Sequence, residues 1–297
     1  MIRRIMGLLT ALGAVVATLV ILPATTASAA DCAAAWNSSS VYTGGGSASY
    51  NGHNWSAKWW TQNEKPGSSD VWADQGSCGS GGTDPGDPGS SADFIVSEAQ
   101  FNQMFPGRSS FYTYSGLTAA LDAYPGFANT GSDTVKKQEA AAFLANVSHE
   151  TGGLVYVVEQ NTANYPHYCD STQPYGCPAG QAAYYGRGPI QLSWNFNYKA
   201  AGDALGIDLL GNPYLVEQDA AVAWKTGLWY WNTQNGPGTM TAHNAMVNGA
   251  GFGETIRSIN GSIECNGGNP AQVQSRIDKY QAFVSILGTT PGSNLSC

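Results

Sequence analysis

The sequence predicts a mainly α-helical (α+β) domain preceded by a small all-β module, and three observations lead to this fold class. Apolar residues recur at i, i+3, i+4 and i+7 over 133–150 and again over 270–287, the spacing of one helix face. Residues 31–78 instead show short alternating runs between glycine-rich turns, which indicate antiparallel strands. Between the two regions, 79–91 reads GSGGTDPGDPGSS, a composition typical of a linker.

Residues 1–30 have the pattern of a signal peptide. Two arginines at 3–4 precede an apolar run over 6–22, and small residues then permit cleavage after Ala29 or Ala30. A retained membrane anchor is the alternative, although the apolar run is short for a spanning helix. The arginine pair is also compatible with twin-arginine export. We therefore expect a secreted, extracellular protein.

The charge balance argues against a nucleic-acid partner. The chain has 13 basic and 21 acidic residues, and charged residues make up only 11% of it. Without the two arginines of the signal peptide, eleven basic residues face 21 acidic ones, which leaves a net charge of about −10. Nucleic-acid binding depends on Lys and Arg that neutralise phosphates. The composition instead suits a protein that handles an uncharged polymer, and less well one that prefers anionic cell-wall polymers.

Six cysteines follow the signal peptide, and an even number in an exported chain indicates disulfides. Six cysteines allow about 15 pairings in principle. Their positions suggest the pairs Cys32–Cys78, Cys169–Cys177 and Cys265–Cys297, of which the first would bracket the small module. Zinc binding is the alternative, but the sequence contains no C-x-x-C pair.

The small module is rich in aromatic residues. It holds five of the nine tryptophans, with two tyrosines: Trp36, Trp55, Trp59, Trp60, Trp72, Tyr42 and Tyr50. A segment this short can bury only a small core unless a disulfide cross-link supports it. The rings therefore form either a compact core alone or an exposed platform of the kind that marks binding sites. The stretch AKWWTQNEKPG at 57–67 is similar to the family 5/12 carbohydrate-binding modules, many of which bind chitin. This resemblance implies that Trp59 and Trp60 stack on sugar rings, with Tyr50 as a candidate third ring.

From residue 92 onward the chain is predicted to be helical. Ser97 and Gln100 stand at capping-box positions of a helix over 97–105, and a further helix is expected over about 113–123. Asp133 is the expected N-cap of the helix over 133–150. We expect Asn161 to Tyr185 to form a long ordered loop over a binding cleft.

Two more helices are expected towards the C-terminus, with an apolar segment between their starts. Asn212-Pro213 is a helix start, and AAVAWKTGLWYW at 220–231 is the apolar heart of the domain, whose tryptophans we expect in the core. The last helix begins at Asn269-Pro270 and ends at Gly288. Its buried stripe is predicted to contain Val273, Ile277, Tyr280, Val284 and Leu287.

Two glutamates lie close to the end of the helix predicted over 133–150. Glu150 falls in its last turn, where unpaired carbonyls disfavour a carboxylate, and shielding from water would further raise the pKa of Glu150, as a general acid needs. Glu159 follows 154–158, an apolar run that we interpret as extended. The turn at Gly152-Gly153 separates the two carboxylates, so that they could flank a substrate. Spacing alone favours the alternative, two solvated surface charges.

Several rival chemistries are excluded by the sequence. His149-Glu150 begins like the zinc-protease motif H-E-x-x-H, but Gly153 stands at the second histidine position. The chain has no G-x-S-x-G elbow, P-loop or dinucleotide fingerprint. We therefore expect His149 to form hydrogen bonds beside Glu150, among the substrate-binding residues, and we expect no metal and no cofactor.

The motifs SHETGG at 148–153 and YGRGPIQLSWNFNY at 185–198 closely resemble the family 19 chitinases, a glycoside hydrolase family, and the resemblance extends over about 93–297. It implies a lysozyme-like, bilobal domain with a deep cleft, and endo-acting, inverting hydrolysis of β-1,4-linked N-acetylglucosamine. Glu150 would protonate the glycosidic oxygen, and Glu159 would activate a water on the opposite face of the sugar. The resemblance also implies the two disulfides that lie in this domain.

The same resemblance implies further site residues. Ser193 would hold the attacking water, and Gln191, Asn197 and Asn260 would contact the sugar, the last from a loop over 260–265. Because Ser193 and Asn197 are four positions apart, they would share a face of the helix that opens at 186–198; capping and solvent exposure are the alternative. Arg276 lies beside the buried stripe of the last helix, and it matches the family arginine near the catalytic base, where its charge would keep a carboxylate ionised.

The sequence thus predicts a secreted endo-chitinase with a signal peptide (1–30), a chitin-binding module (31–78), a linker (79–91) and a catalytic domain (92–297). We expect a monomer that binds chitin and chitooligosaccharides, with no nucleic-acid and no membrane partner. Two rival functions remain, a related hydrolase that acts on peptidoglycan and a chitin-binding protein with an inactive catalytic domain. The second is weakened because both glutamates and the matched serine and asparagines are present.

Overall fold

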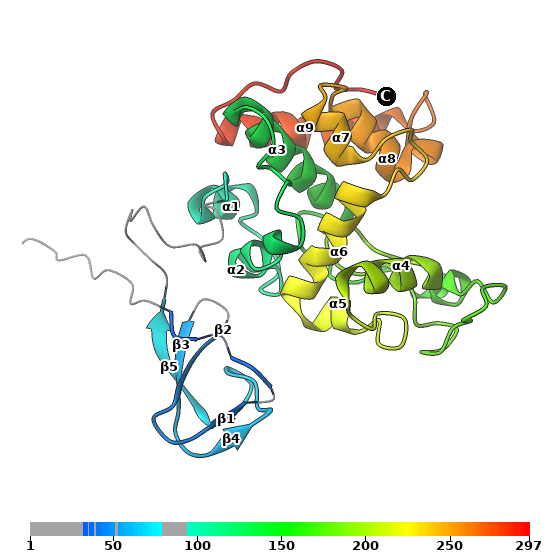
Figure 1. Cartoon of the computed structure of the whole chain (residues 1–297). Coiled ribbons are helices and arrows are strands. Elements are labelled where there is room, and N and C mark those ends of the chain that lie inside the picture. Colours follow the sequence, from blue (N-terminus) through cyan, green and yellow to red (C-terminus); the bar gives the residue numbers. More distant parts are fainter. Residues whose placement is uncertain (1–31, 35, 39, 51–52, 79–93) are drawn as a thin grey trace, which may run out of the picture. The chain divides into compact units, whose positions relative to one another are not determined.

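The computed structural model describes residues 32–297 except 35, 39, 51–52 and 79–93, so the predicted signal peptide and linker lie outside the described residues. The chain divides into two compact units, Met1–Thr83 and Asp84–Cys297 (Figure 1). Within the described part, no helix is both long enough and apolar enough to cross a membrane.

The described part of the first unit consists of short antiparallel strands, as its alternating pattern predicts. Strands β1 (Val41–Tyr42) and β4 (Thr61–Gln62) pair with each other. A three-stranded sheet has the order β2-β3-β5, formed by β2 (Ser47–Tyr50), β3 (His53–Ala57) and β5 (Trp72–Ser77). The predicted Cys32–Cys78 disulfide is present, and it joins the beginning and the end of the module.

The tryptophans of this unit divide between core and surface. Trp72 is buried in a small cluster with Ala48, Ala57 and Val71, and its indole N–H donates to a backbone carbonyl at 2.8 Å. Trp59 and Trp60, in contrast, are 55% and 60% exposed. The module therefore has both a compact aromatic core and an exposed aromatic pair, so the two interpretations that the sequence offered are not exclusive.

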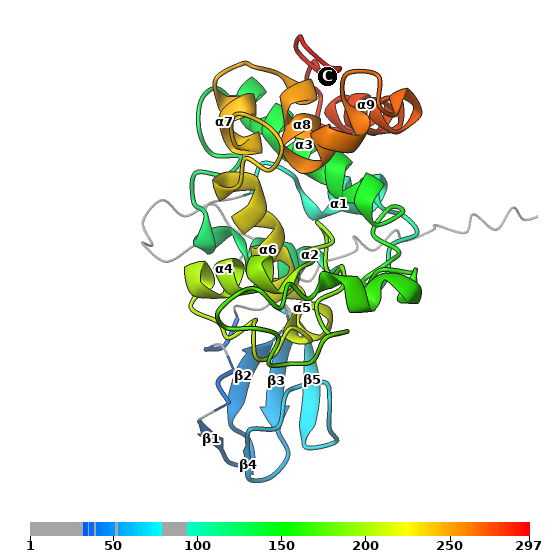
Figure 2. The same ribbon diagram turned by 90° about the vertical axis from the view of Figure 1, so that its right-hand side faces the viewer.

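The second unit is mainly helical, in agreement with the predicted fold class. Its described helices are α1 (Glu98–Met104), α2 (Tyr114–Thr118), α3 (Asp133–Glu150), α4 (Asn195–Leu205), α5 (Leu215–Gln218), α6 (Ala220–Thr233), α7 (Ala242–Val247), α8 (Phe252–Glu264) and α9 (Pro270–Ile286). Two short 3-10 helices, η1 (Leu121–Ala123) and η2 (Thr162–Tyr168), lie between them. Helices α3, α7, α8 and α9 pack together at one end of the unit, whereas α4 and α5 lie at the other (Figures 1 and 2).

Helix α6 connects the two groups of helices, because it packs against α2, α4 and α5 as well as α7 (Figure 2). Its tryptophans Trp224 and Trp231 are fully buried, which confirms that they belong to the core. Phe143 of α3 lies 6.0 Å and 5.4 Å from their ring centroids. This aromatic cluster holds the C-terminal half of α3, and therefore Glu150, in a fixed place.

Several predicted helix ends are confirmed. Ser97 and Gln100 form a complete capping box at α1, and the side chain of Asn269 caps α9, with Pro270 in its first turn. The predicted N-cap of α3 is wrong by one position, because Ser132 rather than Asp133 accepts the capping hydrogen bond. The stripe predicted on α9 is buried.

Three other expectations are wrong. The run 154–158 is not a strand: Gly152, Gly153 and Leu154 have φ values of 62°, 84° and 62°, and only Val158 forms an isolated bridge, to Arg187. Left-handed residues in succession turn the chain instead of extending it.

Helix α4 begins at Asn195, after Trp194 with φ 73°, so Ser193 precedes the helix instead of sharing a face of it with Asn197. Residues 260–264 complete α8 instead of forming a loop, although the helix kinks at Asn260 (φ −143°). A glycine inside a helix costs only about 1 kcal/mol. A Cβ at residue 261 would lie 2.9 Å from Cγ of Arg257, so this position requires the small residue that is present.

Some helices are shorter than expected, and the two remaining predicted disulfides are present. The helix expected over 113–123 is split into α2 and η1, and the one expected from Asn212-Pro213 begins at Leu215. The predicted loop 161–185 contains η2. The pairings Cys169–Cys177 and Cys265–Cys297 are both present, so all three disulfides predicted for the chain are found.

Candidate active site

A pocket of about 490 Å³ lies between the two groups of helices of the second unit. Its walls come from α3, α6 and α8 on one side, and from η2 and the segment that leads into α4 on the other. The lining residues are Glu150, Tyr168, Ile190, Gln191, Leu192, Ser193, Trp194, Asn197, Tyr230, Ile259, Asn260 and Ile263. Five residues predicted from the sequence are therefore brought together: Glu150, Gln191, Ser193, Asn197 and Asn260.

Glu150 ends α3 and forms an ion pair with Arg276 of α9 through the Nη2 of the arginine. The guanidinium is buried and also binds Glu264, the last residue of α8. Its Nε and Nη2 each donate to one carboxylate oxygen of Glu264 at 2.8 Å. Nη1 donates to the side-chain oxygen of Asn146 at 3.1 Å. Two carboxylates thus share one cation, and only Glu150 reaches the pocket.

The buried pair in this cluster is strongly charged. Burial disfavours the charge of Glu264, but the hydrogen bonds and the charge of Arg276 outweigh it and hold the pKa of Glu264 below its ordinary value. Burial likewise disfavours the charge of Arg276, yet its hydrogen bonds to Glu264 and the charge of Glu150 raise its pKa above the ordinary value. Glu264 and Arg276 therefore stay ionised as a buried pair, and Glu150 is the member of the cluster that reaches the pocket.

The position of Arg276 differs from the expectation. The sequence placed this arginine near the catalytic base, Glu159, whereas the structure places it against Glu150 and Glu264. It was also expected beside the buried stripe of α9, but it is only 1% exposed. The reason is that α9 packs against both α3 and α8, so that the side of the helix that carries Arg276 is buried as well.

Glu159 is held by donors that carry no charge. Its Oε1 accepts hydrogen bonds from Asn164 Nδ2 at 2.8 Å and from the Tyr168 hydroxyl at 3.0 Å, and both donors belong to η2. Burial, and then the hydrogen bond to Glu159, raise the pKa of Tyr168 to about 12, so this phenol remains a donor. Glu159 itself does not belong to the lining of the pocket, but Tyr168 does.

The segment between Glu159 and α4 has an unusual backbone. Gln191 and Trp194 have φ values of 52° and 73°, a region that residues other than glycine rarely occupy. Such conformations cluster at functional sites when the surrounding structure enforces them. They place Ser193 between them in the pocket wall, where its carbonyl accepts a hydrogen bond from Asn197 Nδ2 at 3.0 Å.

Gly186 and Gly188 allow close approach, as the sequence predicts, but to this chain's own side chains. A Cβ at Gly186 would lie 3.0 Å from Gln191 Oε1, and one at Gly188 would lie 3.1 Å from Val216. Gly188 also has φ 72°, which a side chain rarely permits.

Asn260 lines the pocket from the kink of α8, and its Nδ2 donates to Glu264 Oε1 at 2.8 Å. The amide therefore connects the pocket wall to the buried end of the Glu150–Arg276–Glu264 cluster. His149, by contrast, is not part of the lining, and its Nδ1 lies 3.2 Å from the hydroxyl of Ser275. Burial, and then the charge of Arg276, lower the pKa of His149, which keeps the ring neutral.

Sequence reasoning missed Glu264 and Tyr230. Glu264 stands in the motif NGSIEC, four residues after Asn260, so the spacing of the two polar side chains was an available signal. Tyr230 lines the pocket from α6 and donates to the carbonyl of Ser258 at 3.0 Å. Its pKa is raised to about 12 by burial and then by the charge of Glu150. Nothing in the apolar run of α6 distinguishes it from the buried tryptophans beside it.

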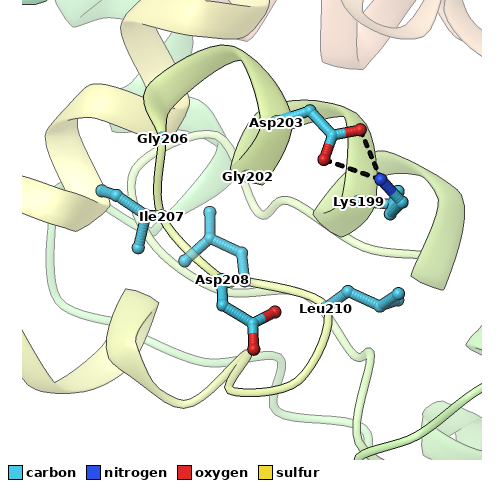
Figure 3. Close-up of a pocket in the computed structure, with 8 residues that line it drawn as sticks. Lys199, Gly202, Asp203, Gly206, Ile207, Asp208 and Leu210 are labelled. Carbon is cyan, nitrogen blue, oxygen red and sulfur yellow. Dashed lines mark hydrogen bonds and ion pairs between the residues drawn. The ribbon is translucent and has the colours of Figure 1, made fainter.

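A second pocket, of about 400 Å³, lies at the C-terminal end of α4 (Figure 3). Its charged groups already have partners: Lys199 contacts Asp203 at 2.6 Å, and Asp208 accepts a hydrogen bond from the backbone N–H of Gly211 at 2.8 Å. None of its lining residues belongs to the predicted site. No cluster of His, Cys, Asp and Glu that could hold a metal ion occurs among the described residues.

Comparisons with protein families agree with the division of the chain into two units. The family described as class I chitinase matches residues 95–297, and the family 5/12 carbohydrate-binding modules match residues 35–73.

Among curated proteins, endochitinase A from Zea mays is 45% identical over 210 residues, which cover 68% of this chain and 71% of that protein. Chitinase 6 from Oryza sativa subsp. japonica is 46% identical over 188 residues, which cover 63% of this chain and 66% of that protein. The chain therefore spans about two thirds of the length of these two plant proteins.

Two solved bacterial structures are more similar in sequence. Chitinase C from Streptomyces griseus HUT6037 is 77% identical, with a TM-score of 0.69, and the match covers 90% of this chain and all of that one. A bacterial family 19 chitinase is 84% identical, with a TM-score of 0.68, and the match covers 69% of this chain and all of that one.

Proposed function

Because the chain belongs to the family 19 chitinases, we propose that it is an endo-acting chitinase that hydrolyses the β-1,4 linkages between N-acetylglucosamine units and inverts the anomeric carbon. The observation that carries the proposal is the position of two glutamates from different segments, one in the wall of the pocket and the other bound to a residue of that wall. Glu150 lies in the pocket wall, and Glu159 binds the wall residue Tyr168. Two carboxylates that flank a glycosidic bond are the machinery of glycoside hydrolysis.

Glu150 acts as the general acid. Arg276 alone would favour its carboxylate form, but Arg276 is already neutralised by Glu264 through two hydrogen bonds of 2.8 Å. With two carboxyl groups and one cation, the cluster carries a net negative charge until a proton is bound. Glu264 is buried and its pKa is lowered, so it stays ionised, whereas Glu150 reaches the pocket and can offer a proton to the substrate. From there it is transferred to the glycosidic oxygen.

Glu159 acts as the general base. Its Oε1 is occupied by Asn164 and Tyr168. Within the described part of the chain, Oε2 accepts a hydrogen bond only from the backbone N–H of Gly186, at 3.5 Å. Oε2 is therefore available to a water molecule. Ser193 holds the same water from the pocket wall, where its hydroxyl can accept and donate a hydrogen bond.

The other polar lining residues are suited to an uncharged sugar. Gln191, Asn197 and Asn260 contribute amide groups, which can bind both acetamido and hydroxyl groups. Two aliphatic side chains, Ile259 and Ile263, complete this part of the wall. Arg276 is turned away from the substrate by its ion pairs, so it acts through Glu150 instead of contacting the sugar.

The first unit binds the polymer and the second cleaves it. Trp59 and Trp60 expose adjacent rings on a module of the family 5/12 type, and such rings stack on the apolar faces of pyranoses. We place the module at 31–78, the linker at 79–91 and the catalytic domain at 92–297, after a signal peptide at 1–30. Secretion agrees with the three disulfides, which persist in oxidising compartments. The protein is proposed to act as a monomer.

Two single substitutions test the assignment. Glu150→Gln and Glu159→Gln should each lower kcat on chitooligosaccharides by about 100-fold to 10,000-fold, the range that general acid–base catalysis contributes. Glu254→Gln is the matched control, because Glu254 is partly exposed and, among the described residues, forms its ion pair with Arg257 at 3.1 Å. Wild-type turnover in a folded Glu150→Gln or Glu159→Gln variant would contradict the role of that residue.

The stereochemistry and the substrate are tested separately. Proton NMR during early hydrolysis should show the α-anomer first, because an inverting enzyme acts on a β-linkage in one displacement. An initial β-anomer would refute inversion. Reducing-sugar release from chitin but not from bacterial cell walls separates this function from that of a peptidoglycan hydrolase, and release from neither substrate would indicate a chitin-binding protein without activity.

A further inference from the structure

One buried cation and two tyrosine rings form a stack that ends at the backbone of Glu159. The guanidinium of Arg187 lies 3.5 Å from the ring centroid of Tyr185. The Tyr185 ring is stacked on the Tyr165 ring, with centroids 3.7 Å apart and planes inclined by 11°. The Tyr165 hydroxyl donates a hydrogen bond to the backbone carbonyl of Glu159 at 2.9 Å. None of these three residues lines the pocket.

Arg187 is the fixed end of the stack. It is fully buried, and its Nε donates to Glu217 Oε2 at 2.7 Å, the oxygen that also accepts from the Tyr185 hydroxyl at 3.2 Å. Nη1 donates to the carbonyl of Ala183 at 2.6 Å and to the hydroxyl of Tyr198 at 2.8 Å. A guanidinium held at two nitrogens cannot rotate without breaking these hydrogen bonds, so the ring that lies against it is fixed as well.

The backbone on either side of Glu159 is attached to the segment that contains Arg187. Val158 forms a bridge with Arg187, and the N–H of Glu159 donates to the carbonyl of Gly186 at 2.9 Å. The N–H of Gly188 donates to the carbonyl of Val157 at 2.8 Å. The N–H of Glu159 is thus held by the 186–188 segment, while its carbonyl is held only from Tyr165 among the hydrogen bonds that the structure describes.

The stack also fixes the donors to the carboxylate of Glu159. Asn164 and Tyr168, which bind its Oε1, belong to η2, and so does Tyr165. A short 3-10 helix is a weak element by itself. The contact between Tyr165 and Tyr185 attaches η2 to the segment that carries Arg187. Displacing that contact would therefore move the carboxylate and its two donors together.

We propose that Tyr165 and Tyr185, anchored by Arg187, are positioning residues for Glu159 in water activation. The inference rests on the proposed role of Glu159 as the base. A catalytic group must stay within a fraction of an ångström of its productive position, and a displacement of about 1 Å can lower the rate 100-fold. Stabilisation of the fold alone would not require the buried Arg187 to be connected, through two stacked rings, to the backbone carbonyl of Glu159.

Three substitutions separate the hydroxyl from the stack. Tyr165→Phe removes the hydrogen bond to Glu159 and keeps the ring, and it should lower kcat about tenfold, somewhat more than the net worth of one hydrogen bond, because the base also moves. Tyr185→Leu removes the stack and should lower kcat about 100-fold. Tyr185→Phe keeps the ring and should restore most of that loss. KM should stay within about twofold in all three, because the substrate contacts in the pocket are unchanged.

A matched control and a double mutant exclude a merely structural effect. Tyr175→Phe removes a hydroxyl in the same loop, which contacts Gln173 at 3.2 Å, and should leave kcat unchanged. In a Glu159→Gln background, Tyr165→Phe should not change the residual rate further, because residues that act through a common group are not additive. A further loss in that background of the same size as in the wild type overturns the inference.

The positioning inference and the role of Glu159 can fail separately. If Glu159→Gln keeps wild-type turnover, the proposed base is wrong and the stack has no catalytic group to position. If Glu159→Gln is inactive while folded Tyr165→Phe and Tyr185→Leu keep wild-type kcat, only the positioning inference is overturned. A lower Tm of Tyr185→Leu with unchanged kcat of its folded fraction has the same meaning.

Discussion

Replacement of Glu264 by glutamine tests whether this residue balances the charge of Arg276 beside the proposed acid, Glu150. The substitution preserves the shape of the side chain but removes its charge, and Glu264 is only 3% exposed. In the wild type, Arg276 gives Glu264 two hydrogen bonds of 2.8 Å. In the variant, Glu150 is the remaining carboxylate that contacts the guanidinium. Arg276 then has one carboxylate partner in place of two.

The magnitude follows from these contacts. Removing one partner of a buried ion pair costs about 3–5 kcal/mol, and because Glu150 remains as a counter-ion we expect the lower end of this range, about 3 kcal/mol of unfolding free energy. A nearby charge changes the proton affinity of a carboxyl group by about one to three pKa units. A change of two such units at the proposed acid corresponds to about 100-fold in rate, so we expect loss of the Glu264 charge to lower kcat at neutral pH by about that factor.

The assay is the pH dependence of kcat on a soluble chitooligosaccharide, together with urea unfolding. Because removal of a negative charge makes a neighbouring carboxyl group lose its proton at lower pH, the activity profile of Glu264→Gln should move to lower pH, and part of the lost rate should return there. Glu254→Gln, on the same helix but partly exposed, should change neither property. A folded Glu264→Gln protein with the wild-type rate and pH profile would refute the shared-cation argument.

Two further predictions concern other parts of the chain. Replacing Trp59 and Trp60 by Ala should weaken sedimentation with insoluble chitin and spare hydrolysis of short soluble substrates, since the module only raises the local enzyme concentration at the polymer. Both rings are more than half exposed, so circular dichroism should show a folded module, whereas Trp72→Ala, a core substitution at 4% exposure, should destabilise it by about 3–5 kcal/mol. Undiminished chitin binding by the folded double variant would contradict the platform. The second prediction concerns His243, whose pKa is raised above its ordinary value by a hydrogen bond to the buried Glu139 and then by the charge of that residue, although burial opposes this. A raised folded-state pKa means that the pair contributes its full stability below the unfolded value of about 6.5, and that this contribution is lost as pH rises through the folded pKa. Above pH 6.5, the Tm of His243→Gln should fall less with rising pH than the Tm of the wild type. An unchanged dependence of Tm on pH would mean that another group causes the loss of stability.

The elements that the sequence predicted well are those whose signals are local. The capping box at Ser97 and the Asn269-Pro270 start of α9 each depend on residues within one turn. The burial of Trp224 and Trp231 follows from a long apolar run with few alternatives. Such features can be predicted without knowing which segments of the chain contact each other.

The predictions that failed depend on contacts between distant segments. The run 154–158 has strand-like composition, but the left-handed residues 152–154 turn the chain at its start, and within the run only Val158 forms a strand-like bridge. The start of α4 was placed too early because the left-handed conformation of Trp194 is imposed by the surrounding structure and has no propensity signal. Periodicity treats every helix as isolated, so it cannot show that two faces of α9 are buried.

The same limit applies to the site. The motif matches identified Glu150, Gln191, Ser193, Asn197 and Asn260, and the structure places all five in one pocket. The electrostatics of that pocket could not be predicted, because the partner of Glu150 lies 126 positions away on another helix. The local sequence around Glu150 shows that it lies at a helix end and that it could be buried. It does not show that the charge of Arg276 lies against its carboxyl group.

The distribution of charge over the two glutamates matches how their protonation changes during the reaction. In the proposed mechanism Glu150 gives its proton to the glycosidic oxygen, so negative charge develops on it as the glycosidic bond breaks. Arg276 is already in contact with that carboxyl group, and an interaction that strengthens as charge develops accelerates the chemical step. As the proposed base, Glu159 would change in the opposite direction, because it takes a proton from the attacking water. A cation there would oppose the proton transfer, and the donors that hold it, Asn164 and Tyr168, are uncharged. An arginine against the acid and neutral donors against the base are therefore the arrangement that favours the transition state at both carboxyl groups.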